Sequence, residues 1–277
     1  MRPFEEVTNL VSRSEDTIRD LMPYAYFLAR AVRRVVDQAV EEHVCVEIIG
    51  GKEVIPHSRP YMAFINTQGY TCGGTLIDSS WVLTAAHCSI NSSTIIGLGL
   101  HTLSKVNKDV QIFKVLKWRK HHYNALTNDN DVQLVQLSGK AQLSNVVKPL
   151  ELPTTFSDVE PGTICESAGW GRTRNEPGSD SDKLLEVSLP VISRQKCAAM
   201  WKPQAQGITK NMMCTLDAAE GKDTCNGDSG GPLICQGQLR GVVSFGPKYC
   251  GNPVEPAVYA FLNEDNVNWI KRGMENK

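Results

Sequence analysis

Short apolar runs separated by turn residues dominate the chain after residue 47. Residues 61–65, 70–77 and 81–86 form one such series, and the segments between them are rich in Gly, Asp and Ser. Similar runs follow, at residues 112–116, 132–137, 164–168, 184–189, 232–235, 239–245 and 257–262. Many short strands at close spacing are typical of antiparallel barrels or sandwiches. The pattern predicts an all-β fold, followed by a final helix over about residues 263–277 that an Asn or Asp can cap.

The first 47 residues have a different pattern. Apolar residues between positions 18 and 36 recur at helical spacing, with three arginines on another face, which predicts an amphipathic helix. Residues 1–20 carry three arginines against five acids, unlike the basic start of a secretory signal. No apolar run reaches the length of about 20 residues that spans a membrane. We expect no transmembrane anchor, and a boundary at Glu47 where the composition changes.

The cysteine content indicates an oxidising compartment. The chain has 277 residues, of which 41% are hydrophobic and 21% charged, enough apolar content for globular cores. Nine cysteines occur without a C-x-x-C pair or a His/Cys cluster at zinc spacing, so disulfides are expected rather than structural zinc. Eight of them follow residue 47 and Cys45 is left over. Counting alone leaves their pairing open.

A candidate nucleophile lies within Gly227-Asp228-Ser229-Gly230-Gly231. Flanking glycines keep the Ser229 hydroxyl clear of side chains and let backbone N–H groups approach the atom under attack. The pattern also fits the nucleophile elbow of α/β-hydrolases, in which the triad runs Ser, acid, His. All six histidines precede Ser229, so that alternative fails. A His, Asp, Ser order remains.

Five motifs together resemble the chymotrypsin/trypsin family of serine proteases in order and spacing. They are Ile48-Ile49-Gly50-Gly51, Thr84-Ala85-Ala86-His87-Cys88, Asn130-Asp131-Val132-Gln133-Leu134, Ala168-Gly169-Trp170-Gly171 and Gly227-Asp228-Ser229-Gly230-Gly231-Pro232. Within the family, residues 48–60 are most similar to granule-stored lymphocyte proteases, granzymes A and K especially. The resemblance covers residues 48–277 and implies two six-stranded antiparallel β-barrels, about 48–160 and 161–262, with a C-terminal helix at 263–277.

The resemblance implies a catalytic role for three residues. His87 would act as general base, Asp131 would orient and stabilise its imidazole, and Ser229 would attack the peptide carbonyl. The backbone N–H groups of Gly227 and Ser229 would bind the oxyanion. Taken singly, His87 reads as a core histidine, Asp131 as a turn residue and Ser229 as a loop serine. The order of all five motifs favours the catalytic reading.

Activation by cleavage is implied for Asp228 and Ile48. In this family the α-amine released at the Ile-Ile-Gly-Gly motif pairs with the aspartate before the nucleophile and shapes the oxyanion hole. Residues 1–47 would then be a removable helical leader or pro-region. Glu47 precedes the cut, so a dipeptidyl peptidase that removes Val46-Glu47 fits better than autoactivation. The alternative is that Asp228 is only a solvated turn residue. A secreted or secretory-granule location follows from the resemblance.

The resemblance places Asp223 at the base of the first specificity pocket, where a buried carboxylate binds a Lys or Arg side chain. Two residues depart from trypsins: Thr224 replaces a serine and Ala257 replaces a usual glycine, so that its methyl group narrows the pocket. The alternative is an ordinary loop acid at Asp223. The wall that pairs with the substrate backbone would be formed by Ser244, Phe245 and Gly246.

The resemblance also implies disulfide pairs and expected absences. Cys45 would leave with the pro-region, so a monomer is expected. Residues 100–111 lack the paired acids with which trypsins bind calcium, and Pro256 stands where sodium-binding relatives carry tyrosine, so no metal is expected. Peptide hydrolysis needs no cofactor. The implied pairs are Cys72 with Cys88, Cys165 with Cys235, Cys197 with Cys214, and Cys225 with Cys250.

Charge and surface motifs suggest further partners. Residues 48–277 carry 16 Lys and 7 Arg against 21 acids. Six cations in one stretch would suit a heparin-like proteoglycan, although a plain solvated face is an equal reading. The resemblance implies peptide substrates and serpin-type inhibitors, and no nucleic acid. Asn91 starts the one glycosylation sequon. The rival function is a non-catalytic homologue. The six cations are Lys105, Lys108, Lys114, Lys117, Arg119 and Lys120.

Overall fold

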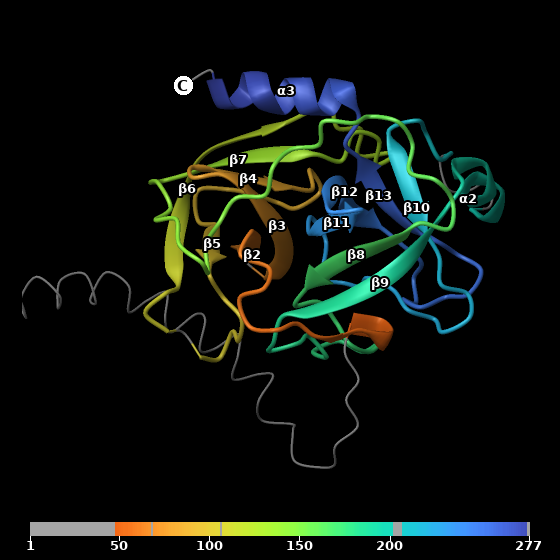
Figure 1. Ribbon diagram of the computed structural model, residues 1–277, viewed down its shortest axis with the longest axis horizontal. Helices are drawn as coiled ribbons and strands as arrows, with labels where there is room; N and C mark the ends of the chain where they lie inside the picture. Colours follow the sequence, from red (N-terminus) through yellow and green to blue (C-terminus); the bar gives the residue numbers. More distant parts are fainter. Residues whose placement is uncertain (1–47, 68, 106, 202–206, 276–277) are drawn as a thin grey trace, which may run out of the picture.

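The computed structural model describes residues 48–67, 69–105, 107–201 and 207–275. Two antiparallel β-barrels lie side by side, with the first on the left of Figure 1 and the second on the right. The predicted amphipathic helix, Cys45 and Glu47 lie outside the described residues. The all-β prediction with two six-stranded barrels is confirmed.

Six strands close the first barrel in the order β2-β3-β4-β7-β6-β5. The apolar runs predicted for β2, β3, β4, β6 and β7 fall on strands, whereas β5 was missed. A bulge in β6 between Val115 and Lys117 shifts its register against β7, which bends the longest strand around the barrel. The bounds are β2 Met62–Thr67, β3 Tyr70–Asp78, β4 Trp81–Thr84, β5 Ile95–Leu98, β6 Gln111–Lys120 and β7 Gln133–Leu137.

The second barrel has the order β9-β10-β13-β12-β11-β8 and closes through the pairing of β8 with β9. The short strand β10 was not predicted. A further two-residue strand, β1 (Lys52–Glu53), pairs with the outer edge of β9. The bounds are β8 Ile164–Gly169, β9 Leu185–Ile192, β10 Met212–Thr215, β11 Pro232–Cys235, β12 Gln238–Phe245 and β13 Ala257–Phe261.

Two α-helices accompany the barrels. Helix α3 (Glu264–Glu275) is the predicted C-terminal helix, and Asn263 caps it by accepting a hydrogen bond from Asn266 N at 2.9 Å. Helix α2 (Arg194–Met200) is capped by Ser193, whose side chain accepts from Lys196 N. This helix was not predicted, because seven residues are too few for a helical pattern to stand out.

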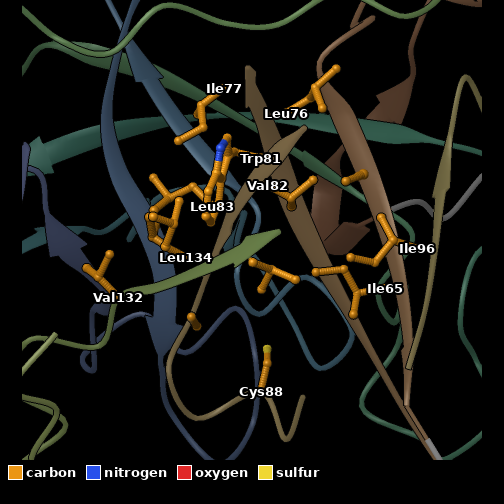
Figure 2. Close-up of a cluster of buried hydrophobic side chains, with 14 of the residues drawn as sticks. Ile65, Leu76, Ile77, Trp81, Val82, Leu83, Cys88, Ile96, Val132 and Leu134 are labelled. Atoms are coloured by element: carbon orange, nitrogen blue, oxygen red, sulfur yellow. The ribbon is translucent and has the colours of Figure 1, made fainter. Parts of the chain in front are cut away.

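The largest hydrophobic core fills the first barrel and continues beyond it. Figure 2 shows its centre, where Ile65 of β2 lies beside Ile96 of β5, and Val82 of β4 belongs to the same cluster. Leu239 and Val242 of β12 belong to the same cluster, as does Ile270 of α3. The two barrels therefore share apolar packing, and the candidate site residues between them rest on a continuous core.

The two ends of the described chain are exchanged between the barrels. The initial segment, including β1, leaves its own barrel and lies beside β9 (Figure 1). Arg59 adds an ion pair to Glu186 of β9 at 2.5 Å. At the other end, α3 follows the second barrel but packs on the first, and a Cβ at Gly273 would lie 2.8 Å from Leu134 Cδ2. Each barrel is therefore covered by a segment from the opposite end of the chain.

Four disulfides join the same pairs that the family resemblance implies. Three of them lie within the second barrel and its loops, and one lies in the first. Among the described residues, no helix is long and apolar enough to cross a membrane. The pairs are Cys72–Cys88, Cys165–Cys235, Cys197–Cys214 and Cys225–Cys250.

Candidate active site

His87 lies in a turn that directly follows β4. Strand β4 ends at Thr84, and Cys88 N donates to Ala85 O at 3.2 Å to close the turn. The Cys72–Cys88 disulfide ties this turn to β3. The His87 side chain is 31% exposed, so its ring sits at the surface of a fixed backbone. One face of the imidazole is thus available to a substrate.

Asp131 is fully buried and holds His87 at two points. Its Oδ1 accepts from His87 N at 2.8 Å, and its Oδ2 lies 2.7 Å from His87 Nδ1. Ser244 Oγ donates to the same Oδ2 at 2.5 Å. Three hydrogen bonds therefore satisfy the buried carboxylate. Because Nδ1 of the neutral ring must be the donor to a carboxylate, Nε2 is left as the basic nitrogen.

Ser229 stands in a turn whose shape requires glycine on both sides. Gly227 has φ +100° and Gly230 has φ +82°, a region that L side chains rarely adopt. A Cβ at Gly227 would lie 2.8 Å from Gly171 Cα, and one at Gly230 would collide with Thr84 Oγ1. The turn is anchored to the first barrel, because Gly73 N donates to Ser229 O at 2.8 Å.

The N–H groups of this turn alternate between bonded and free. Asp228 N donates to Cys225 O at 3.0 Å and Gly230 N donates to Val243 O at 2.8 Å. Within the described part of the chain, the N–H groups of Gly227 and Ser229 donate to no protein acceptor. Two unused donors separated by one residue are what an oxyanion site requires. Both belong to the residues expected to form that site.

One pocket of about 280 Å³ brings most of the candidate residues together. His87 and Ser229 both line it, although they come from different barrels. Asp223 and Ala257 were expected at the pocket, yet neither lines it. Asn226 and Pro247 do line it, and Asn226 lies directly before the nucleophile motif. The expected wall residues in the lining are Thr224, Ser244, Phe245 and Gly246.

Asp223 lies behind the pocket lining and is 5% exposed. Gly251 N donates to its Oδ2 at 2.9 Å. Burial raises the pKa of Asp223 to about 6, and the hydrogen bonds from Gly251 and Thr224 N–H groups lower it only in part. Ala257 is also buried, and a Cβ at Gly246 would lie 3.9 Å from Ala257 Cα. The backbone segments of Gly246 and Ala257 therefore lie close together.

Asp228 is a second buried acid, with no exposed surface. Its two carboxylate oxygens accept from Gly171 N at 2.8 Å and Cys225 N at 2.9 Å. Burial raises the pKa of Asp228 to about 7. No cationic side chain of the described residues forms an ion pair with it. The alternative that Asp228 is a solvated turn residue is therefore wrong.

Ile48 is buried in the core of the second barrel. The next residue is docked beside the pocket, since Asp223 N donates to Ile49 O at 3.1 Å. Gly50 has φ +71°, so a glycine is required where this segment turns toward β1. The Ile48 motif is thus packed against the turn that carries Asp223, rather than extending into solvent.

Comparison with known proteins agrees with this geometry. The family model described as Trypsin matches residues 48–270. The chain belongs to the trypsin family of serine proteases. This trypsin-family chain is a serine endopeptidase by the same family assignment.

Three relatives show where this protease stands within the family. Granzyme A of Bos taurus is 39% identical over 91% of this chain and 97% of its own length. Mast cell protease 3 of Ovis aries is 41% identical over 82% of this chain and 89% of its own length. Granzyme B of Rattus norvegicus is 41% identical over 83% of this chain and 92% of its own length. The protease is therefore related to granzymes and mast-cell proteases.

Two parts of the protease's cleft were not found from sequence. Trp201 packs edge-on against Phe245 at 5.5 Å between ring centroids, so the pocket wall is braced by a residue that no motif marks. Gly169 and Gly171 belong to a recognised motif, but their role emerges only in three dimensions. A Cβ at Gly171 would lie 2.5 Å from the carboxylate carbon of Asp228. Both glycines make room for that carboxylate.

The surface motifs of the protease lie away from this pocket's lining. Asn91 Oδ1 accepts from Ser93 N at 2.8 Å and Ser93 Oγ at 2.5 Å. No group of three or more His, Cys, Asp or Glu side chains arranged to hold a metal occurs in the described ranges. Four of the six clustered cations lie on β6 and two on the loop before it, namely Lys114, Lys117, Arg119 and Lys120, and Lys105 and Lys108.

Proposed function

We propose that this protease cleaves peptide bonds after Lys or Arg, using His87, Asp131 and Ser229. The observation that carries the proposal is the meeting of His87 and Ser229 in one pocket. His87 is already held by Asp131 at 2.7 Å, in the tautomer that leaves Nε2 basic. The non-catalytic alternative has no observation of its own in its favour.

The reaction follows from these positions. His87 Nε2 accepts the Ser229 hydroxyl proton while Ser229 Oγ attacks the substrate carbonyl carbon. The carbonyl oxygen becomes an oxyanion and takes the free N–H groups of Gly227 and Ser229. His87 then gives its proton to the leaving amine, which leaves an acyl group on Ser229. Water, deprotonated by His87, hydrolyses this ester and restores the serine.

The proposed specificity rests on Asp223. This carboxylate is buried, and no cationic side chain of the described residues forms an ion pair with it. A Lys or Arg side chain that enters from the pocket would supply the missing positive charge. Thr224 lines the pocket and follows Asp223 in the chain, so the substrate's cation would reach past it. The buried methyl group of Ala257 narrows the approach, which favours the slimmer Lys or weakens both basic residues.

Activation by cleavage before Ile48 is the second part of the proposal. Ile48 is buried in the core of the second barrel, and the carbonyl oxygen of the next residue, Ile49, accepts a hydrogen bond from Asp223 N. A new α-amine at Ile48 would supply the cation that Asp228 lacks and would hold the oxyanion turn. Residues 1–47 would leave as a pro-region, with Val46-Glu47 removed last by a dipeptidyl peptidase.

The names of the relatives suggest a setting for the enzyme. We infer a secreted or granule-stored protease. A monomer is expected because Cys45 would leave with the pro-region, and the family resemblance implies serpin-type inhibitors. A heparin-like proteoglycan would bind the six cations on and before β6. Asn91 is the candidate glycosylation site, since it starts the sequon Asn91-Ser92-Ser93.

One experiment tests the catalytic proposal. Matched peptide substrates ending in Lys, Arg, Phe or Asp would be offered to protein cleaved before Ile48, with uncleaved protein and Ser229→Ala as controls. We expect hydrolysis after Lys or Arg by the cleaved form alone. Activity that survives Ser229→Ala would overturn the triad, and equal activity before and after cleavage would overturn the activation step. Folded, cleaved protein that hydrolyses none of the four would support the non-catalytic alternative.

A further inference from the structure

We propose that Asp129 is a positioning residue, which clamps the loop that carries Asp131 to the second barrel. The inference rests on the proposed triad. Asp131 and His87 belong to the first barrel and Ser229 to the second, so catalysis depends on how the barrels are held together. A direct link beside Asp131 would set that alignment.

The side-chain contacts of Asp129 with Thr209 and Asn211 cross to the second barrel. Its Oδ1 accepts from Thr209 Oγ1 at 2.5 Å, and its Oδ2 accepts from Asn211 Nδ2 at 3.1 Å. Thr209 and Asn211 form the entry to β10, and Asn211 O accepts from Phe261 N of β13 at 2.8 Å. Asp129 is thus joined to two strands of the second barrel through side chains only two residues apart.

The network continues to the start of α3 and has a fixed direction. Asn263 Nδ2 donates to Asn211 Oδ1 at 2.9 Å, and Asn263 Oδ1 accepts from Asn266 N at 2.9 Å. A backbone N–H can only donate, so Asn263 must present its oxygen to Asn266 and its amide to Asn211. Asn211 must then present its amide to residue 129. Only an acceptor at residue 129 satisfies the chain of bonds.

The loop transmits this constraint to Asp131 over a short distance. Asn128 and Asn130, on either side of Asp129, have φ +52° and +53°, and such left-handed residues hold a defined turn. Tyr123 Oη donates to Asn128 Oδ1 at 2.9 Å. The side chains of Asp129 and Asp131 are therefore fixed relative to each other. A shift at Asp129 would move Asp131 and, with it, the His87 ring.

The experiment exchanges donor and acceptor between residues 129 and 211 in cleaved full-chain protein. Asp129→Asn keeps only one acceptor oxygen, so its amide group must face either Asn211 Nδ2 or Thr209 Oγ1, and Asn211→Asp places two carboxylates against each other. The double exchange restores every donor–acceptor pair, because the new amide at residue 129 would donate to the new carboxylate at residue 211, which would still accept from Asn263. We expect kcat on a Lys substrate to fall about 10-fold in Asp129→Asn and about 100-fold in Asn211→Asp, because small displacements of reacting groups are costly. The double variant should recover to within about 3-fold, with KM changed less than about 2-fold throughout.

A matched control separates positioning from stability. Asp158 forms a bidentate pair with Arg194 at 2.7 and 2.8 Å, which also ties distant segments together but does not touch the loop that carries Asp131. Asp158→Asn should leave kcat unchanged. The proposal is overturned if the single exchanges lower Tm without lowering kcat at 25 °C, or if the double exchange is no more active than the singles. Inactive unmodified protein would instead refute the proposed function.

Discussion

Asp131 of the first barrel and Asp228 of the second are both fully buried carboxylates, yet their surroundings differ. Asp131 meets the imidazole of His87 and the hydroxyl of Ser244, besides one backbone N–H. Asp228 meets only two backbone N–H groups, and burial raises its pKa to about 7. The first carboxylate has the side-chain partner that can share a positive charge, and the second does not.

Asp223 resembles Asp228 more than Asp131. It is buried in the second barrel, and its pKa is raised to about 6. The difference between the barrels teaches that the acid of the proposed proton-transfer pair already has its side-chain partners, whereas the proposed substrate-binding half holds two carboxylates that lack cations among the described residues. We infer that one cation comes from the cleaved chain and the other from the substrate. The predictions below test that division.

The largest effect is expected at the carboxylate with a side-chain partner. Asp131→Asn should lower kcat by about 10⁴-fold, the size known for this class of triad, because the amide no longer holds the required tautomer. The thermal midpoint should change little, since the buried volume is kept. Stopped-flow or steady-state hydrolysis of a Lys ester by the cleaved protein measures the loss. A fall of less than about 10-fold would show that Asp131 is not the orienting acid.

Asp228→Asn should act in opposite directions before and after cleavage. In cleaved protein it removes the partner of the new α-amine, and loss of the oxyanion geometry should lower kcat by about 10³-fold. In uncleaved protein it removes a buried charge and should stabilise the fold above pH 7. Parallel activity assays and urea titrations check the two arms. Equal stability of both uncleaved proteins at pH 8 would contradict the account of this carboxylate.

The same substitution makes a pH test in uncleaved protein. Because the pKa of Asp228 is raised from 3.8 to about 7 on folding, the folded state binds this proton more tightly than the unfolded state. The contribution of Asp228 to stability is therefore full below about pH 4 and is lost as the pH rises to about 7, a decline of up to about 4 kcal/mol. Asp228→Asn should flatten that decline. If stability declined by the same amount in the unmodified and Asp228→Asn proteins, the decline would belong to other titrating groups.

Asp223→Asn tests the second unpartnered carboxylate. Removing one member of a buried charge pair should lower kcat/KM for Lys and Arg substrates by about 10²-fold. Hydrolysis of a Phe substrate, however slow, should not fall, because its side chain needs no charge. The ratio of kcat/KM values for Lys and Phe peptides is the measurement. An equal loss on both peptides would place the effect outside the specificity pocket.

A cationic inhibitor should report the titration of Asp223 itself. Benzamidine binding requires the ionised carboxylate, and its pKa of about 6 predicts that binding weakens as the pH falls through 6. The inhibition constant should rise by about 10-fold between pH 7 and pH 5. Calorimetric titration measures binding without relying on His87 as a base. Asp223→Asn protein, as the control, should bind weakly at both pH values with little change.

The smallest effect is expected from the wall of the pocket. Ala257→Gly removes a buried methyl group, and we expect the ratio of kcat/KM for Arg over Lys to rise by about 3-fold, since one methylene-sized change is worth little more. Thr224→Ser, which also restores the residue usual in trypsins, serves as a comparison at a position that lines the pocket. A fall in the Arg to Lys ratio would mean that Ala257 does not narrow the approach.

The sequence marked the motif residues because each lies in a short segment in which several neighbouring residues fit the same geometric requirement. Gly227 and Gly230 illustrate this, since the turn geometry requires both and the first also carries one of the two free N–H groups that we propose bind the oxyanion. The predicted strands were found where apolar runs were long. Strand β5 was missed because Gly97 interrupts it and Gly99 follows it, and barrel closure rather than local preference makes it a strand.

Side-chain direction accounts for most of what could not be predicted at the site. The family resemblance led us to expect Asp223 and Ala257 at the pocket, yet both are buried and neither lines it. The contact of Trp201 with Phe245 and the clamp from Asp129 to Asn211 join segments about 40 and 80 residues apart. No local pattern carries such distant pairings, because they follow from how the barrels and loops pack.

The exchanged chain ends determine when each barrel can be completed during synthesis. As the polypeptide emerges from the ribosome, the strands of the first barrel appear long before α3, whose Val267 and Ile270 complete their core. The segment at Ile48 must likewise wait for Glu186 and its neighbours in β9 before it can dock. The first barrel is therefore completed by a helix that is translated after the second barrel, and the second barrel by a segment that is translated before the first.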